Sequence, residues 1–234
     1  GTLPMNTSHR KTLVFSYLSS TFTLLLVLSN LVLSSKLIPT TFFNFIIPGG
    51  LILYPLTFLI SDVVNEIFGP KKARVMIFSA FIANLLASSI VQIFMFFPVA
   101  SPEMQTAWHC LFDLSPLRFL ASLLAFIVSQ QLDIVLYTFF KNRTPNSSLW
   151  LRSNGSTWIS QIPDTFIVDT CILYFGMGLS FPQTLNIMFY SYIYKITFCV
   201  LTTPLFYLAV NTIRKFLGMP STKIANTVPL INQP

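Results

Sequence analysis

Charged side chains are scarce in this chain. Only 9% of its 234 residues are Asp, Glu, Lys or Arg, whereas 53% are hydrophobic, and the mean hydropathy is +0.70. Water-soluble domains usually carry about 25% charged residues, so the composition excludes an ordinary soluble protein. The 24 Phe residues exclude intrinsic disorder, because disordered chains contain few aromatic residues. Lipid is therefore the expected solvent for most of the chain.

Cysteine and histidine are also scarce. Cys110, Cys171 and Cys199 are too dispersed for a disulfide scaffold, and two of them lie inside apolar runs. Neither His9 nor His109 lies at the depth of a predicted membrane span, and the sequence contains no zinc, P-loop or serine-hydrolase motif. We therefore predict no enzyme activity, no catalytic residue, no metal and no cofactor.

Six apolar stretches are long enough to cross a hydrocarbon core of about 30 Å as helices. Continuous apolar runs favour helices over the short alternating segments of a membrane barrel. We predict an all-α polytopic fold with six transmembrane helices, over residues 13–35, 43–68, 73–97, 117–140, 158–177 and 185–208. Residues 1–218 would form a single membrane domain and residues 219–234 a polar cytoplasmic tail. The outer connection 98–116 predicts a short interfacial helix or lid.

The basic residues indicate the orientation, because Lys and Arg are retained on the cytoplasmic side of a membrane. The predicted spans leave only Lys36 and Arg118 on the outer side. Both termini are then cytoplasmic, in the inner membrane. The net charge of +7 reflects this topology, so no direct nucleic-acid partner is predicted. The inner side carries Arg10, Lys11, Lys71, Lys72, Arg74, Lys141, Arg143, Arg152, Arg214, Lys215 and Lys223.

Six charged residues are predicted to lie at membrane depth. Such groups cost at least a few kcal/mol to insert, so each indicates a functional site or an ion pair. Five acids accompany one base, so at most one acid has the lysine as its exclusive partner. Asp62 and Glu66 of the second span could instead cap the basic turn that follows it. Asp133 and Asp169 of the fourth and fifth spans could also form an aspartyl dyad, because two carboxylates can share a proton. The six are Asp62, Glu66, Asp133, Asp164, Asp169 and Lys195.

Uncharged polar residues within the spans point to a polar pocket. Asn30, Gln130 and Gln161 are expected to face the bundle interior, and aromatic residues such as Tyr194 are available to wall the pocket. A surplus of buried carboxylates suits a cation. It equally suits a planar heterocycle that presents two adjacent N–H donors to one carboxylate, as a guanine edge does.

Several motifs occur in a distinctive order. The sequence reads SDVVNEIFG at residues 61–69, followed by KAR at 72–74, then QQLD at 130–133 and SQIPDT at 160–165. YIYK at 192–195 precedes TPLFY at 203–207. Together these motifs resemble the queuosine precursor transporter family, small six-helix membrane proteins that are also described as vitamin uptake transporters.

The resemblance implies uptake of 7-deazaguanine bases or queuine across the cytoplasmic membrane, for insertion into transfer RNA. It also implies a fold similar to the substrate-binding components of energy-coupling-factor importers. Asp62 and Arg74 would be gate or helix-end residues, and Asp169, which matches no motif, is a candidate for proton coupling. The implied substrate-binding residues are Glu66, Asp133, Asp164, Lys195, Gln130, Gln161, Asn30 and Tyr194.

Two alternative functions stay open at this point. The chain could be a substrate-binding subunit of an energy-coupling-factor vitamin importer, which needs a separate ATPase. It could also be a non-transporting membrane assembly factor, in which the buried charges only pair helices. The expected partners are a heterocyclic base and the lipid bilayer, and a homo-oligomer or an energising partner stays open.

Overall fold

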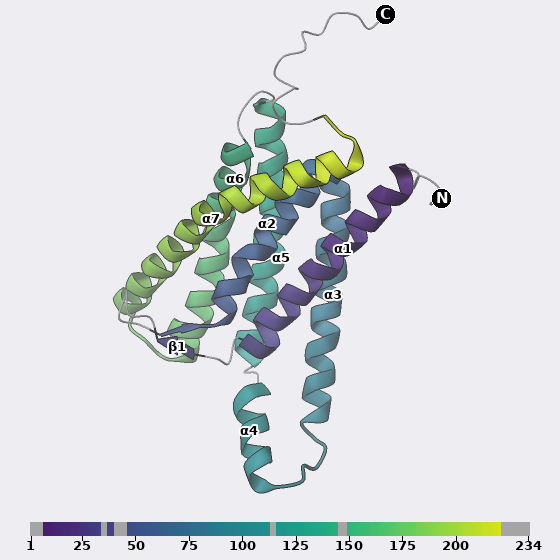
Figure 1. Cartoon of the computed structure of the whole chain (residues 1–234). Coiled ribbons are helices and arrows are strands. Elements are labelled where there is room, and N and C mark those ends of the chain that lie inside the picture. Colours follow the sequence, from purple (N-terminus) through teal and green to yellow (C-terminus); the bar gives the residue numbers. More distant parts are fainter. Residues whose placement is uncertain (1–6, 34–36, 40–45, 113–115, 145–148, 221–234) are drawn as a thin grey trace, which may run out of the picture.

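The computed structural model describes residues 7–33, 37–39, 46–112, 116–144 and 149–220. Its helices are α1 (Thr7–Val27), α2 (Gly50–Phe68), α3 (Pro70–Phe94), α4 (Pro102–Phe112), α5 (Pro116–Arg143), α6 (Leu149–Asp169) and α7 (Phe181–Leu217) (Figure 1). Two π-helical segments continue α1 and α6, η1 (Leu28–Val32) and η3 (Thr170–Gly176). Strands β1 (Leu37–Pro39) and β2 (Ile46–Pro48) form a small antiparallel ribbon. The predicted all-α class is confirmed, with this ribbon as an addition.

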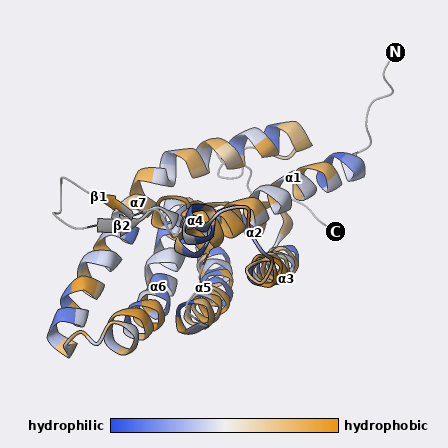
Figure 2. Ribbon diagram, turned by 90° about the horizontal axis from the view of Figure 1, so that it is seen from below, coloured by the Kyte–Doolittle hydropathy of each residue, from blue (hydrophilic) through white to orange (hydrophobic). Residues whose placement is uncertain are grey.

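Five segments of the described chain are long and apolar enough to span a membrane: α1 with η1, α2, α3, α5 together with α4, and α7. The chain is thus a polytopic membrane protein. The remaining long helix, α6, is too polar to meet the same measure, although it lies alongside α5 within the bundle (Figure 2). Its polar residues are those that build the site described below.

The exposed surface of the bundle is apolar and its interior is partly polar. Along α3, large apolar side chains three or four residues apart are exposed, among them Phe78, Ile82 and Leu86. In contrast, Gln130 and Asp133 of α5 are completely buried. This inverted arrangement is expected where the surrounding solvent is hydrocarbon and polar groups must be satisfied inside the protein.

Two apolar clusters hold the helices together. The first joins α1, α2, α3 and α5 through residues such as Phe22, Val64 and Phe126. The second joins α2, α5, α6 and α7 and includes Tyr137 and Phe206. Because lipid tails are as apolar as these side chains, the clusters stabilise the bundle through close van der Waals contact more than through removal of apolar surface from water.

The beginning of α2 differs from the prediction. The second span was predicted from residue 43, but β2 precedes the helix and α2 begins only at Gly50. Proline disfavours helical backbone in the residue before it, so Pro48 delays the helix. A Cβ atom at Gly50 would lie 2.4 Å from the carbonyl oxygen of Ser29. Glycine at this position therefore lets α2 begin directly against η1.

Two further predicted boundaries were wrong, and both corrections concern basic residues. The fifth span was predicted from residue 158, but α6 begins at Leu149, so Arg152 belongs to the helix and not to a loop. Likewise α7 runs to Leu217 and ends at Gly218, whose left-handed backbone (φ 68°) stops the helix. Arg214 therefore lies inside α7. Basic residues near a helix end still allow the helix to continue into the polar headgroup region.

The described helix ends fall into two groups (Figure 1). The start of α1, the α2–α3 junction, the end of α5, the start of α6 and the end of α7 lie at one end of the bundle, and α4 lies at the other. At 1.5 Å per residue, the 37 residues of α7 extend about 55 Å. A helix that exceeds a core of about 30 Å must tilt, and α7 crosses the bundle obliquely (Figure 1). Helix α4 confirms that the connection 98–116 contains a short helix, whereas its place on the outer side and a lid role stay predictions.

Candidate functional site

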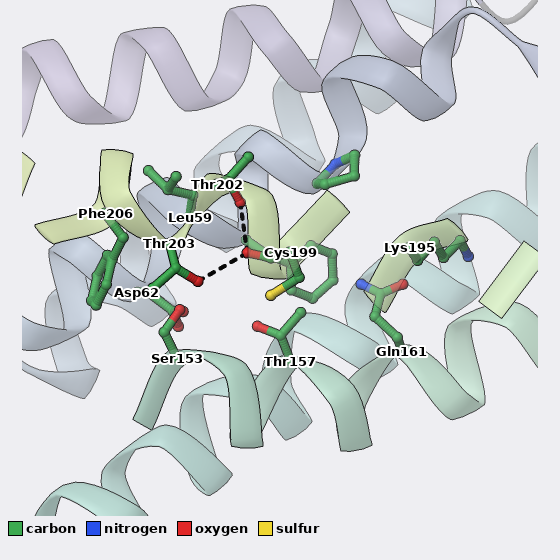
Figure 3. A pocket seen from close by; sticks show the side chains of 12 residues that line it. Leu59, Asp62, Ser153, Thr157, Gln161, Lys195, Cys199, Thr202, Thr203 and Phe206 are labelled. Carbon is green, nitrogen blue, oxygen red and sulfur yellow. Dashed lines mark hydrogen bonds between the residues drawn. The ribbon is translucent and has the colours of Figure 1, made fainter. Parts of the chain in front are cut away.

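A narrow pocket lies between α2, α6 and α7 (Figure 3). Its polar wall includes Asp62 of α2, Gln161 of α6 and Lys195 of α7, three of the residues singled out from the sequence. Phe58 and Phe206 contribute aromatic surface. In this conformation the pocket has room for about one water molecule, so a larger ligand would require the helices or side chains around it to move.

Asp62 and Asp133 form a buried carboxyl pair beside the pocket. Asp62 is 1% exposed, Asp133 is completely buried, and the two side chains interact directly. Ser153 donates a hydrogen bond to Oδ2 of Asp62, while Thr157 (3.3 Å) and Ser160 (3.1 Å) donate to Oδ1 of Asp133. Asp62 lines the pocket and Asp133 does not. The predicted ligand Asp133 therefore lies behind Asp62.

Lys195 pairs with Asp164. Its Nζ lies 2.6 Å from Oδ2 of Asp164 and donates a second hydrogen bond of 3.1 Å to Thr165. Tyr54 of α2 donates to the other carboxylate oxygen at 2.9 Å. Both charged side chains are about 95% buried, and each charge is neutralised by the other inside the bundle. One acid thus takes the intramembrane lysine as its partner, and the lysine still borders the pocket.

Glu66 lies at the end of α2, among three basic side chains from three other helices. Arg152 of α6 contacts both carboxylate oxygens at 3.1 and 3.2 Å, and Arg214 of α7 approaches to 2.6 Å. Lys141 of α5 lies 3.4 Å from the carboxylate and donates to the backbone carbonyl of Glu66. Tyr137 completes the shell with a hydrogen bond of 2.9 Å. Glu66 therefore joins four helices at one end of the bundle and does not cap the turn at Lys71 and Lys72.

The remaining predicted residues do not line the pocket. Gln130 is buried and donates to Thr57, and Asn30 accepts a hydrogen bond from Ser122. Tyr194 contacts the ring of Phe198. Asp169 lies at the end of α6, where it interacts with Ser191 and faces the charges of Lys195 and Asp164. Arg74 is exposed on α3. Their roles in binding, gating or coupling stay predictions.

Sequence reasoning missed the polar face of α6 and the basic residues that bind Glu66. The signal was present in the sequence: Ser153, Thr157, Ser160 and Asp164 recur at intervals of three or four residues, and Arg152 directly precedes the first of them. This spacing places them on one side of a helix. Arg152 and Arg214 were interpreted only as orientation signals, because apolar length alone defined the predicted spans.

The fold and the site define a polytopic membrane protein with a polar pocket and compensated charges inside the bundle. The chain belongs to the family described as "Putative vitamin uptake transporter", whose sequence profile matches residues 48–209. This range contains α2 and α6 and most of α7, the helices that line the pocket. The predicted family is confirmed, and membership in a transporter family confirms the prediction that the chain is not an enzyme.

Two relatives have the same name. A "Probable queuosine precursor transporter" of Bacillus subtilis is 35% identical over 164 residues, which cover 68% of this chain and 70% of the relative. A "Probable queuosine precursor transporter" of Haemophilus influenzae is 24% identical over 184 residues, 77% of this chain and 76% of the relative. No solved structure matches the chain.

Proposed function

We propose that this protein imports queuosine precursors, 7-deazaguanine bases or queuine, across the cytoplasmic membrane for transfer-RNA modification. The observation that carries the proposal is the similarity to two proteins of that name, over 68% and 77% of this chain. The pocket chemistry supports it independently, because a polar pocket inside a membrane bundle suits a small heterocycle that must be shielded from lipid.

The side chains at the pocket wall match the groups of a deazaguanine base. Asp62 offers a carboxylate to the adjacent N–H donors of the guanine-like edge. The Gln161 side-chain carbonyl is buried and receives no hydrogen bond in the described structure, so it is a further acceptor. Lys195, oriented by Asp164, donates to the ring carbonyl. Phe58 and Phe206 present ring surface to the planar base.

The other acids that were predicted as ligands position the residues of the pocket wall and do not themselves line the pocket. Asp133 and Asp164 orient Asp62 and Lys195, and Glu66 fixes the end of α2. Because the pocket has room for about one water molecule, we expect α7 to move away from α2 and α6 when a base binds. The base contacts then form in a wider conformation than the one described here.

We propose that both termini are cytoplasmic and that residues 1–218 form one domain of the inner membrane. The basic residues of the described helices support this orientation. Lys71 in the first turn of α3, and Lys141 and Arg214 in the last turns of α5 and α7, belong to helix ends that lie opposite α4, whereas Arg118 belongs to the first turn of α5, near α4. Lys36, Lys223 and nearly all of the predicted tail lie outside the described residues. A fold similar to the substrate-binding components of energy-coupling-factor importers is proposed on the number of long helices.

The test uses bacterial cells that cannot make the base and lack their own importer. The cells express the parent chain, Asp62→Asn or the exposed control Glu103→Gln, and receive a low concentration of precursor. The parent and the control are expected to restore queuosine in transfer RNA. A hydrogen bond to a charged group contributes about 1.5–3 kcal/mol, so Asp62→Asn is expected to reduce uptake at low concentration by about tenfold or more. No restoration by a membrane-inserted parent chain would refute autonomous import, and co-purification with an ATPase would favour the subunit alternative.

A further inference from the structure

We propose that Asp62 and Asp133 form a proton-binding site that couples base uptake to proton uptake. This inference rests on the proposed function, because the coupled substrate is the base that occupies the adjacent pocket. Sequence reasoning named Asp169 as the candidate for coupling. The geometry of the buried carboxyl pair points to a different position, deeper in the bundle and directly beside the pocket.

The pair lacks a positive partner within the described residues. The described side chains that donate to it are neutral hydroxyl groups, among them those of Ser153, Thr157 and Ser160. One oxygen of each carboxyl group, Oδ1 of Asp62 and Oδ2 of Asp133, is buried and receives no hydrogen bond. The described ion pairs within the bundle involve Glu66 and Asp164 instead. Each carboxyl group therefore receives neutral hydrogen-bond donors, but no cation among the described residues is placed to neutralise two negative charges.

A proton shared between Asp62 and Asp133 would remove one negative charge and supply the missing hydrogen-bond donor. Two adjacent carboxylates without a cation repel each other strongly in a medium of low dielectric constant, and such pairs hold one proton between them. A proton on either group turns that group into a donor for the other. The two oxygens that lack a partner are one on each residue, as a single O–H···O⁻ hydrogen bond between the residues requires.

The surrounding charges do not replace this proton. Glu66 is the nearest further acid on α2, and its charge is offset by the basic residues that bind it. Lys195 on α7 is engaged by Asp164 of α6. The other titratable groups that face the pair are Tyr137 of α5, which donates to Glu66, and Cys199 of α7.

The position of Asp62 provides the coupling. With a proton on Asp133, Asp62 is a single carboxylate that accepts the N–H donors of the base without a second buried negative charge. Without the proton, the same complex would contain two adjacent carboxylates. Proton binding and base binding therefore favour each other, and this coupling is reciprocal. An O–H bond forms on Asp133 with a proton from the outer water and breaks to release that proton to the cytoplasmic water.

Reconstituted full-length protein in sealed liposomes tests this proposal. The probe is radiolabelled 7-cyano-7-deazaguanine, a base without a titratable side-chain amine, and valinomycin with equal potassium on both sides holds the membrane potential at zero. A gradient of one pH unit, acid outside, corresponds to a tenfold ratio of proton activity. For one proton per base, the parent should accumulate the base about tenfold, and a protonophore should abolish this accumulation. A sodium gradient that drives accumulation in place of the pH gradient would overturn the proposal.

Asp133→Asn and Asp169→Asn form a matched pair of variants. The amide group that Asp133→Asn introduces can donate to Asp62 as a protonated carboxyl would, but it releases no proton. Asp133→Asn should therefore still exchange labelled for unlabelled base, while its accumulation ratio falls from about tenfold to about one. Asp169→Asn should retain the tenfold accumulation. The reverse result, with coupling lost in Asp169→Asn and kept in Asp133→Asn, would place the proton site at Asp169 and refute our assignment.

Infrared difference spectroscopy without any base separates this inference from the proposed function. The parent protein should show the carbonyl stretch of a protonated carboxylic acid over a range of pH, and both Asp62→Asn and Asp133→Asn should remove it. If the parent shows the infrared band but exchanges no base, the proposed substrate is refuted and the proton site is still supported. Base exchange by the parent without the band would refute the proton site. The measurement on the parent does not depend on how well a variant folds.

Discussion

Replacing Glu66 by Gln is expected to destabilise the bundle strongly. The carboxylate is 2% exposed and binds Arg152, Arg214 and Lys141, whose side chains are 8%, 15% and 33% exposed. An amide of the same shape leaves these cations close together without a counter-charge. Removing one partner of a buried ion pair typically costs about 3–5 kcal/mol. The contribution of Lys141 is the smallest, because water screens a side chain that is one-third exposed.

We expect a loss near the lower limit, about 3 kcal/mol, because Arg214 and Lys141 can turn toward the headgroup region. For a chain of this size, 1 kcal/mol shifts the melting temperature by about 2–4 °C, so Glu66→Gln should melt about 6–12 °C below the parent. The measurement is tryptophan fluorescence of the purified chain in detergent during heating. Glu103→Gln, on the exposed surface of α4, is the matched control and should change stability by less than about 1 kcal/mol.

A double variant tests the electrostatic origin of the effect. If surplus positive charge destabilises Glu66→Gln, then removing one cation in the same chain should recover part of the loss. Glu66→Gln with Arg152→Gln should thus be less destabilised than the sum of the two single variants, by about 0.5–3 kcal/mol. Additive losses, or a Glu66→Gln variant that melts with the control, would show that this cluster does not hold the four helices together.

Three further outcomes are expected. Asp164→Asn should lower the melting temperature, because it leaves the buried Lys195 ammonium without its close partner. The expected loss of stability is about 3 kcal/mol, and adding Lys195→Met in the same chain should recover about half of it. Thermal unfolding measures both variants, and no recovery would contradict the pairing. Cys199 lines the pocket and Cys110 is exposed, so bound base should slow thiol labelling of Cys199 several-fold without affecting Cys110, as mass spectrometry of labelled peptides would reveal. Gly50→Ala should destabilise the protein more than Gly155→Ala. The new Cβ at position 50 meets a backbone carbonyl at 2.4 Å, whereas at position 155 it meets the ring of Phe140 at 3.2 Å, which can turn aside. Equal melting temperatures of the two variants would argue against the close approach of α2 to η1.

The sequence was sufficient to predict the long apolar helices and the charged residues among them. Apolar length identifies α1, α3 and α5 because their lipid-facing sides are apolar throughout. It places helix ends less well, because helices that contact headgroups extend beyond their apolar parts. This is why Arg152 and Arg214 were assigned to connections although both belong to helices.

The partners of the charged residues could not be predicted from the sequence. Five acids and one lysine allow several pairings, and the pairing that forms depends on how α2, α5, α6 and α7 are rotated toward one another. The structure pairs Lys195 with Asp164 across α7 and α6, and it brings Asp62 next to Asp133 across α2 and α5. Neither contact follows from spacing along the chain. Both pairs join two different helices, and the residues of the first pair are 31 positions apart.

The polarity of α6 explains both the weak membrane signal of this helix and its place in the site. Its buried face contains Arg152, Ser153, Thr157, Ser160 and Asp164, and each of them contacts a charged group of another helix. A helix with such a face is costly to expose to lipid, so it must lie beside helices that supply complementary groups. The acids of α2 and α5 and the lysine of α7 supply them. The residues that lower the apolarity of α6 are thus the residues that hold the pocket and the carboxyl pair in position.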